Sequence, residues 1–222
     1  MLAGDASAPP SPPAAAAVFG ARLPIASEYV AVLASIGVER GLIGPREVPR
    51  LWDRHLLNCA VIGELIPAGA ELIDVGSGAG LPGIALALAR PDLRITLLEP
   101  AERRKAFLGE VVSRLELSGV MVVRGRAEDG RRQPVEIVTA RAVAPLARLV
   151  PWCLPLVLPG GRLLAVKGAG ATAEIEAAAI VVKAAGGRPA TIRLCGLGTV
   201  DPPTTVVEVA HAAASVRRKV KT

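Results

Sequence analysis

The stretch ELIDVGSGAGLPG, residues 71–83, predicts the fold of this chain. Its first five residues are mostly apolar, which is typical of a short buried strand. Four glycines follow, at positions 76, 78, 80 and 83, and Pro82 stands where a helix over residues 83–90 would begin. Glycine lets the backbone turn sharply and lets a flat ligand approach closely. A strand, a glycine-rich turn and a helix in this order predict the nucleotide-binding corner of an open α/β sheet.

Two kinds of cofactor fit this corner. Residues 78–83 match the dinucleotide spacing G-x-G-x-x-G, whose pyrophosphate is bound by backbone N–H groups. Gly76-x-Gly78-x-Gly80, with Asp74 just before it, instead resembles the first motif of S-adenosylmethionine (SAM) methyltransferases. SAM carries an ammonium and a sulfonium, so an acid in the loop is useful there, whereas it would repel a phosphate. We therefore favour SAM, held at Asp74, Gly76 and Gly78; a purely structural turn capped by Asp74 is the alternative.

Apolar runs and helical patterns alternate along the rest of the chain, which predicts a mostly parallel sheet covered on both faces. The last two expected strands are joined without a helix and should pair antiparallel, a feature of methyltransferase sheets. We therefore predict an α/β, Rossmann-like class I SAM-dependent methyltransferase fold with seven strands, an antiparallel last strand and an N-terminal helical extension. The expected strands are residues 71–75, 94–98, 120–123, 135–140, 162–166, 190–194 and 204–210; the expected helices are 25–38, 45–66, 83–90, 101–117, 145–156 and 171–185.

Composition narrows the class of protein. The net charge of +6 permits nucleic acid as a partner, while the aromatic fraction of 2% argues against a base-stacking platform. Three isolated cysteines imply neither a zinc site nor a disulfide framework and fit a reducing cytoplasm. The most apolar late run, residues 149–158, contains two prolines and is too short to cross a bilayer, so we expect no membrane span.

The chain divides into four expected segments. Residues 1–20 form a Pro/Ala-rich tail, most of it with little to bury, and we expect disorder there. Residues 21–68 form a helical cap, residues 69–212 the methyltransferase domain, and residues 213–222 a basic tail. The cap, which precedes the first strand, is a candidate lid for the substrate or a simple cover for the sheet.

Two acidic positions extend the cofactor site. Glu99 ends the second expected strand about twenty residues past the glycines, where an acid binds ribose hydroxyls; it could also cap the next helix. Ala127 and Glu128 follow the third strand, at the place where adenine-binding loops of methyltransferases lie. A solvated charged turn is the alternative for this second pair.

The residues after the fourth expected strand indicate which kind of atom accepts the methyl group. The fourth strand leads into Arg141 and not into an Asn/Asp-Pro-Pro-aromatic tetrad, and Cys153 belongs to an apolar helix. Amine methylation and cytosine-carbon methylation are therefore disfavoured. A ring nitrogen such as guanine N7 needs no base, since alignment alone can promote the transfer. Arg141 and Lys167 could grip the target; ion pairing at the sheet edge is their alternative.

Four motifs together resemble one family: WDRHLLN at 52–58, IDVGSGAGLPGI at 73–84, ARA at 140–142 and LAVKG at 164–168. They are similar to those of the bacterial 16S ribosomal RNA guanine-N7 methyltransferases, long called glucose-inhibited division protein B, over residues 25–210. The resemblance implies SAM as donor and a guanine of 16S ribosomal RNA as acceptor. It implies cofactor contacts at positions occupied here by Gly76, Leu81, Glu99, Ala127, Glu128 and Arg141.

The same resemblance assigns the acceptor side. Arg54 and His55 match the family's R-H pair, for which we expect RNA or target-base contact; a satisfied core histidine is the alternative for His55. Two departures from the family pattern, at residues 41–44 and at Asn58, lie on this side.

Basic residues near the end of the chain suit RNA phosphates. Arg217, Arg218 and Lys219 resemble the family's basic tail, and their contacts would be sequence-independent and salt-sensitive. We expect 16S ribosomal RNA or the small ribosomal subunit as partner, a monomeric enzyme and no metal. Two alternatives stay open: a SAM-dependent methyltransferase for a small molecule or protein, and a non-catalytic nucleotide-sensing RNA-binding protein.

Overall fold

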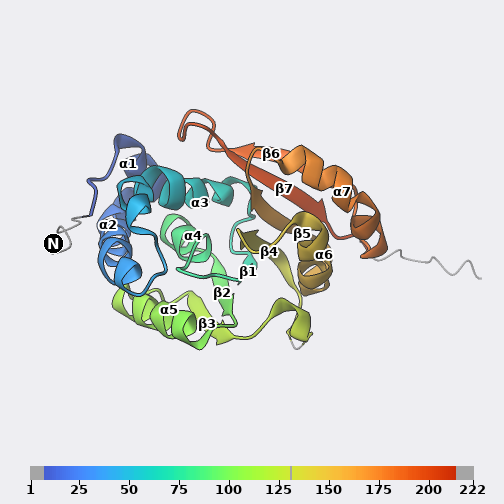
Figure 1. Ribbon diagram of the computed structural model, residues 1–222, viewed down its shortest axis with the longest axis horizontal. Coiled ribbons are helices and arrows are strands. Elements are labelled where there is room, and N and C mark those ends of the chain that lie inside the picture. The colour runs from blue at the N-terminus through green and yellow to red at the C-terminus, as the bar shows by residue number, and fades with distance from the viewer. Residues whose placement is uncertain (1–7, 131, 214–222) are drawn as a thin grey trace, which may run out of the picture.

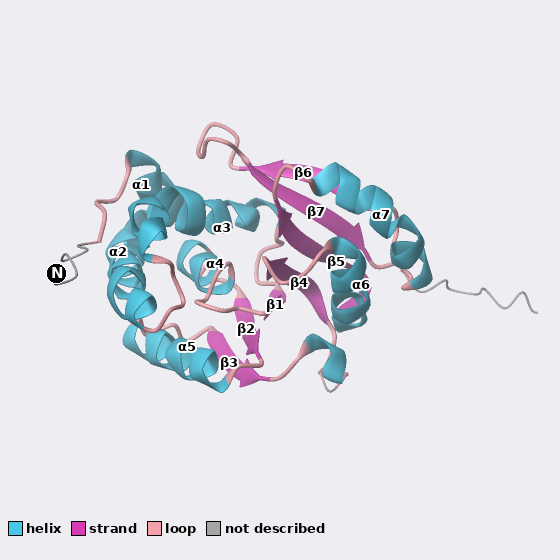
Figure 2. Ribbon diagram, in the orientation of Figure 1, coloured by secondary structure: helices cyan, strands magenta, loops and turns pink. Residues whose placement is uncertain are grey.

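A computed structural model describes residues 8–130 and 132–213 of the chain. Its centre is a seven-stranded sheet with the strand order β3-β2-β1-β4-β5-β7-β6 (Figures 1 and 2). The predicted α/β fold is confirmed, with each strand close to its expected place. The strands are β1 Glu71–Val75, β2 Arg94–Glu99, β3 Val120–Arg124, β4 Val135–Arg141, β5 Val157–Lys167, β6 Thr191–Cys195 and β7 Thr204–Ala210.

Pairing within the sheet is parallel except at one end. Strands β1 to β5 pair in parallel, whereas β7 runs antiparallel to both β5 and β6. The antiparallel last strand is as predicted. Strand β5 begins at Val157, five residues before the expected 162, and a register shift opposite Val135 and Ile137 accommodates this early start.

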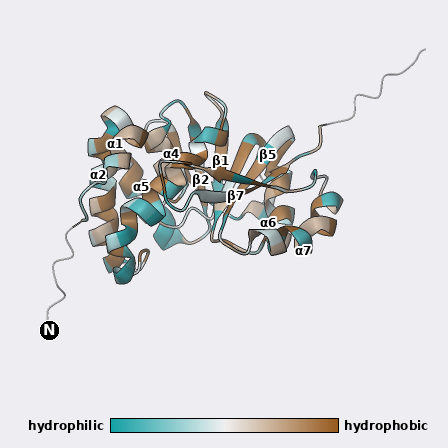
Figure 3. Cartoon of the chain, turned by 90° about the horizontal axis from the view of Figure 1, so that it is seen from above, coloured by the Kyte–Doolittle hydropathy of each residue, from teal (hydrophilic) through white to brown (hydrophobic). Residues whose placement is uncertain are grey.

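Helices cover both faces of the sheet (Figure 3). Helices α4, Gly83–Ala89, and α5, Glu102–Arg114, pack on the face that carries Leu72 and Leu97. Helices α6, Leu146–Cys153, and α7, Ala171–Ala184, pack on the other face. Neighbouring residues of each strand therefore enter different cores, which is the expected consequence of side-chain alternation.

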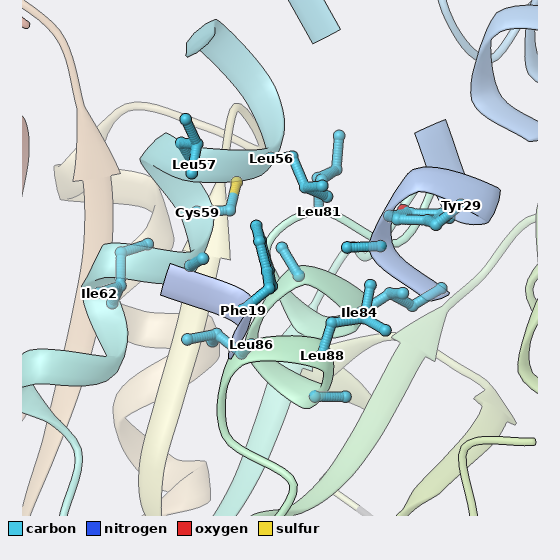
Figure 4. Packing of buried hydrophobic residues seen from close by; sticks show 14 of the residues in the cluster. Phe19, Tyr29, Leu56, Leu57, Cys59, Ile62, Leu81, Ile84, Leu86 and Leu88 are labelled. Carbon is cyan, nitrogen blue, oxygen red and sulfur yellow. The ribbon is translucent and has the colours of Figure 1, made fainter. Parts of the chain in front are cut away.

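A helical cap precedes β1 and shares one apolar core with α4 (Figure 4). Leu81 and Ile84, from the glycine-rich stretch, lie among cap residues such as Tyr29 and Leu56. The cap is thus built into the fold beside the cofactor corner. Its elements are α1 Pro13–Phe19, η1 Gly20–Arg22, α2 Leu23–Val32, η2 Leu33–Gly37, η3 Pro45–Arg50, η4 Leu51–Leu57, α3 Asn58–Ala60 and η5 Val61–Leu65.

The tail predicted to be disordered up to residue 20 is partly ordered, so that prediction was wrong for residues 8–20. Helix α1 buries Ala15 completely, and Phe19 meets the ring of Trp52 edge to face at 6.2 Å. The indole N–H of Trp52 donates to the carbonyl of Pro9 at 3.0 Å. The partner of this segment lies more than thirty residues later in the chain, where local composition gives no sign of it.

One helical stretch, Pro13–Gly37, is long and apolar enough to cross a membrane by length and composition alone. In the structure the C-terminal half of this stretch buries Tyr29, Val30 and Leu33 in the shared core. One third (33%) of its most apolar window is buried, and core helices of soluble proteins and N-terminal signal sequences pass the same test of length and hydropathy.

Candidate cofactor and acceptor site

The glycine-rich loop after β1 requires its glycines. Gly76, Gly78 and Gly80 have φ angles of +69°, +58° and +100°, a region that favours glycine. A Cβ built on Gly76 would lie only 2.8 Å from Cγ2 of Val143, so the β4–α6 loop closely covers this turn. The loop can therefore present backbone to a flat ligand only with glycine at these positions.

Asp74, on β1, stabilises this loop through hydrogen bonds to α4 and β4. Its side chain is fully buried, with Oδ2 accepting from the Gly83 N–H at 3.1 Å and Oδ1 from the Thr139 hydroxyl at 3.1 Å. Burial raises the pKa of this carboxyl from 3.8 to about 7. The enclosed carboxyl fixes the first turn of α4 to β1 and β4, which is the structural role considered as the alternative, and its predicted cofactor contact stays a prediction.

Glu99 lies at the end of β2 and joins two backbone segments. Oε2 accepts from the Gly78 N–H at 2.9 Å, and Oε1 accepts from the Ala101 N–H at 2.9 Å. The second contact lies just before α5, whose N-cap residue is Ala101, so Glu99 is not the N-cap that was considered as its alternative role. Glu99 is 1% exposed, and its ribose contact stays a prediction, for which each carboxylate oxygen can still accept a further hydrogen bond.

Ala127 and Glu128 lie in a short turn after β3, η6 Ala127–Asp129. Ala127 is buried in the core under α6, whereas the side chain of Glu128 is 40% exposed, with Arg126 3.7 Å away. The carboxyl ends of β1, β2 and β3 therefore bring the loop glycines, Glu99 and this turn to one edge of the sheet.

These residues fit SAM on three grounds. The glycine turn exposes backbone where a Cβ on Gly78 would meet no side chain within 4 Å. Glu99 offers a fixed carboxylate beside that turn. Arg141, Glu99 and Glu128 supply charges of both signs, which suits a ligand with a carboxylate and an ammonium. The individual contacts of the predicted cofactor residues stay predictions.

Arg141, the last residue of β4, reaches across to the cap. Its guanidinium donates to Sγ of Cys59 at 2.9 Å, to the Arg54 carbonyl at 3.2 Å and to Nδ1 of His55 at 2.9 Å. Four separate atoms of the cap, counting the His55 carbonyl at 3.5 Å, therefore surround one side chain of the sheet edge. The planar guanidinium suits this role because it holds several donors in fixed directions.

His55 is held between two charged groups. An arginine can only donate, so Nδ1 of His55 must accept, and Nε2 carries the proton and donates to Oε2 of Glu47 at 2.9 Å. Burial lowers the pKa of His55, and the Arg141 charge lowers it further against the opposing effect of Glu47. The neutral imidazole thus links Glu47 to Arg141, with both ring nitrogens engaged inside the protein.

A cavity of about 780 Å³ lies beside Arg141, between the cap and the carboxyl ends of β4 and β5. Arg54 and Asn58 line it from the cap, and Lys167 lines it from the sheet. The hydroxyl of Thr204 donates to the Asn58 carbonyl at 3.0 Å and fixes the cap to β7. The other lining residues are Arg141 to Pro145, Val166, Gly168, Ala169, Glu174 and Pro202 to Thr205.

Lys167 is ion-paired at the rim of this cavity. Its Nζ lies 2.7 Å from Oε2 of Glu174 and donates to the Ala144 carbonyl at 2.8 Å. The same Glu174 oxygen accepts from the Leu146 N–H at 2.7 Å, at the start of α6. Ion pairing, the alternative considered for Lys167, is what the structure contains, and a catalytic role for it stays a prediction.

The structure therefore brings Arg141, His55 and Arg54 together and places Lys167 at the same cavity. Arg217, Arg218 and Lys219 lie outside the described residues. Sequence reasoning missed Glu47, Cys59 and Thr139 as partners of the site. Glu47 precedes the R-H pair by seven residues within the same helical stretch, and that spacing was the one available signal.

Comparison with solved structures shows which fold the chain has. The chain superposes with a TM-score of 0.60 on the mitomycin 7-O-methyltransferase, at 18% identity, covering 83% of this chain and 60% of that one. It superposes with a TM-score of 0.54 on a SAM-dependent methyltransferase from Aquifex aeolicus, at 17% identity, covering 77% and 100%. The fold is that of the Rossmann-like SAM-dependent methyltransferases.

Sequence comparison defines the family. The profile of the rRNA small subunit methyltransferase G family matches residues 22–200. The ribosomal RNA small subunit methyltransferase G of Salinispora tropica is 57% identical, covering 95% of this chain and 91% of that protein. The protein of the same name from Thermobifida fusca is 57% identical, covering 88% and 83%. The chain belongs to the rRNA small subunit methyltransferase G family, and the suspected family is confirmed.

Proposed function

We propose that this protein transfers a methyl group from SAM to N7 of one guanine in 16S ribosomal RNA. Family membership supports ribosomal RNA of the small subunit as the substrate. Bound SAM supplies an electrophilic methyl group on a sulfonium. The residues of the chain bind the donor, orient the base and exclude water.

The observation that favours a ring nitrogen as methyl acceptor is the pairing of the charged side chains that line the cavity. Among the described lining residues, the carboxylate is that of Glu174, which is paired with Lys167, and the Arg141 guanidinium is engaged with the cap. An exocyclic amine must lose a proton and a ring carbon needs a nucleophile, whereas N7 of guanine already carries an in-plane lone pair. A cavity without a free base therefore suits N7.

Cavity size is compatible with this acceptor and with the alternative. About 780 Å³ falls in the range of ligand pockets, so a nucleobase turned out of an RNA loop or a small molecule could enter. Arg54 supports RNA as the acceptor, since this residue lines the cavity and its side chain is 60% exposed. Arg217, Arg218 and Lys219 are proposed as further phosphate contacts.

Mapping of 16S ribosomal RNA from a strain lacking the gene tests the proposal. We expect one 7-methylguanine to disappear and to return with the wild-type gene. An unchanged pattern would favour a small-molecule or protein acceptor. We also propose that the enzyme acts as a cytoplasmic monomer, which sedimentation at working concentration would check.

A further inference from the structure

A buried tyrosine joins the helical cap to the glycine-rich loop. The hydroxyl of Tyr29, on α2, donates to the carbonyl of Ala79 at 2.7 Å, fifty residues later in the chain. Ala79 lies between Gly78 and Gly80, at the centre of the cofactor turn. The cap therefore contacts the loop by a directional bond as well as by apolar packing.

The buried surroundings of this hydroxyl keep it a hydrogen-bond donor. The side chain of Tyr29 is fully buried beside Leu81 and Ile84 (Figure 4). Burial raises the pKa of the phenol well above 10, with Cys59 and Asp74 adding to the effect. The group stays protonated and acts as a donor.

The loop is built to receive that donor. Gly80 has a φ of +100°, and a Cβ there would lie 2.8 Å from the Tyr29 oxygen. The turn itself is closed by the Gly80 and Leu81 N–H groups, which donate to the Ser77 carbonyl at 2.7 and 3.1 Å. Among the described residues, Tyr29 is the hydrogen-bond donor to the Ala79 carbonyl.

We infer that Tyr29 is a positioning residue for the cofactor: the cap holds the Gly78–Gly80 turn in its binding conformation through the bond from Tyr29 to Ala79. The inference rests on the proposed function, because the ligand of that turn is SAM. Asp74 fixes the far end of the same turn at Gly83, so the loop is held from the sheet and from the cap.

Tyr29→Phe removes one oxygen and leaves the ring. Loss of a bond to a partly buried carbonyl should weaken SAM binding by about fivefold, measured as the Kd in calorimetry without RNA. In steady-state kinetics KM for SAM should rise by about the same factor, with kcat and KM for RNA unchanged, since the bond is present before and during transfer.

Trp52→Phe is the matched control. It removes another side-chain donor of the cap to a backbone carbonyl, that of Pro9, which is not part of the loop. Both variants should lower Tm by a few degrees, and only Tyr29→Phe should change the Kd for SAM.

The outcomes separate the two claims. Equal Kd values for wild type and Tyr29→Phe, or equal losses in both variants, would overturn the positioning role while wild-type binding still supports the proposed function. Failure of the wild-type protein to bind SAM would overturn the proposed function and the inference together.

Discussion

Arg141 donates to Nδ1 of His55 across 2.9 Å, and this bond joins the carboxyl end of β4 to the helical cap. It fixes the tautomer of His55 and turns its other nitrogen toward Glu47. Arg141 thus lies at the meeting point of the cofactor turn, the acceptor cavity and the cap. Its role in closing that junction can be tested separately from its charge.

Arg141→Lys should lower kcat/KM for methyl transfer by tenfold or more, since a lysine keeps the charge but cannot serve Cys59, Arg54 and His55 together. Arg162→Lys is the control. Arg162 also ties the cap to the sheet, through the Leu65 carbonyl at 3.0 Å, but it lies in the middle of β5, opposite Ile137 of β4. Equal losses of kcat/KM in the two variants would mean that activity needs a cap–sheet contact in general and not the contacts of Arg141 in particular.

His55 predicts a dependence of stability on acid. Its folded-state pKa lies below 6.5, so the unfolded chain binds the proton more readily. The stabilisation is present above pH 6.5 and is lost as the pH falls through the folded-state value. Urea unfolding at pH 5 to 8 should show a larger acid loss for wild type than for His55→Gln. Parallel curves would show that His55 is not held neutral.

The raised pKa of Asp74 predicts the opposite dependence of folding stability on pH. Its pKa is raised from 3.8 to about 7, so its stabilising contribution is present below pH 3.8 and is lost as the pH rises through 7. Asp74→Asn can keep both bonds, with the amide oxygen accepting from Gly83 and the amide nitrogen donating to Thr139. From pH 5 to 8 the variant should gain stability relative to wild type in urea unfolding. A relative loss would indicate an ionised carboxylate that the fold needs.

Arg54 should contribute to RNA affinity through phosphate. Arg54→Ala should weaken binding of a 16S fragment across sequences and reduce the slope of log Kobs against log salt by about 1. Arg94→Ala is the control, because Arg94 is similarly exposed but lies at the amino end of β2, away from the cavity. A change of slope in the control alone would place the RNA on another face.

The sheet was predictable because its evidence is local. Strand β1 and helix α4 follow from one apolar run, one glycine turn and Pro82. Strand β5 was predicted too short, at residues 162–166, whereas in the structure the strand continues through Pro159, Gly160 and Gly161, which are residue types that usually interrupt strands.

The site was predictable only in part because its contacts are distant in sequence. The position of Arg141 follows from the end of β4, but its partners His55 and Cys59 lie more than eighty residues earlier. No local pattern reports such a pairing. A structural role for Asp74 was considered as an alternative, but its partner Thr139 was not predicted, because it lies sixty-five residues later.

The most direct test of the central claim is methylation by the purified protein. Small ribosomal subunits from a strain lacking the gene are incubated with SAM labelled in its methyl group, and the modified nucleotide is identified by mass mapping. The proposal predicts one label per subunit, on N7 of a single guanine of 16S ribosomal RNA. Label on an exocyclic amine or a ring carbon, or no label on RNA while SAM is bound, would contradict it.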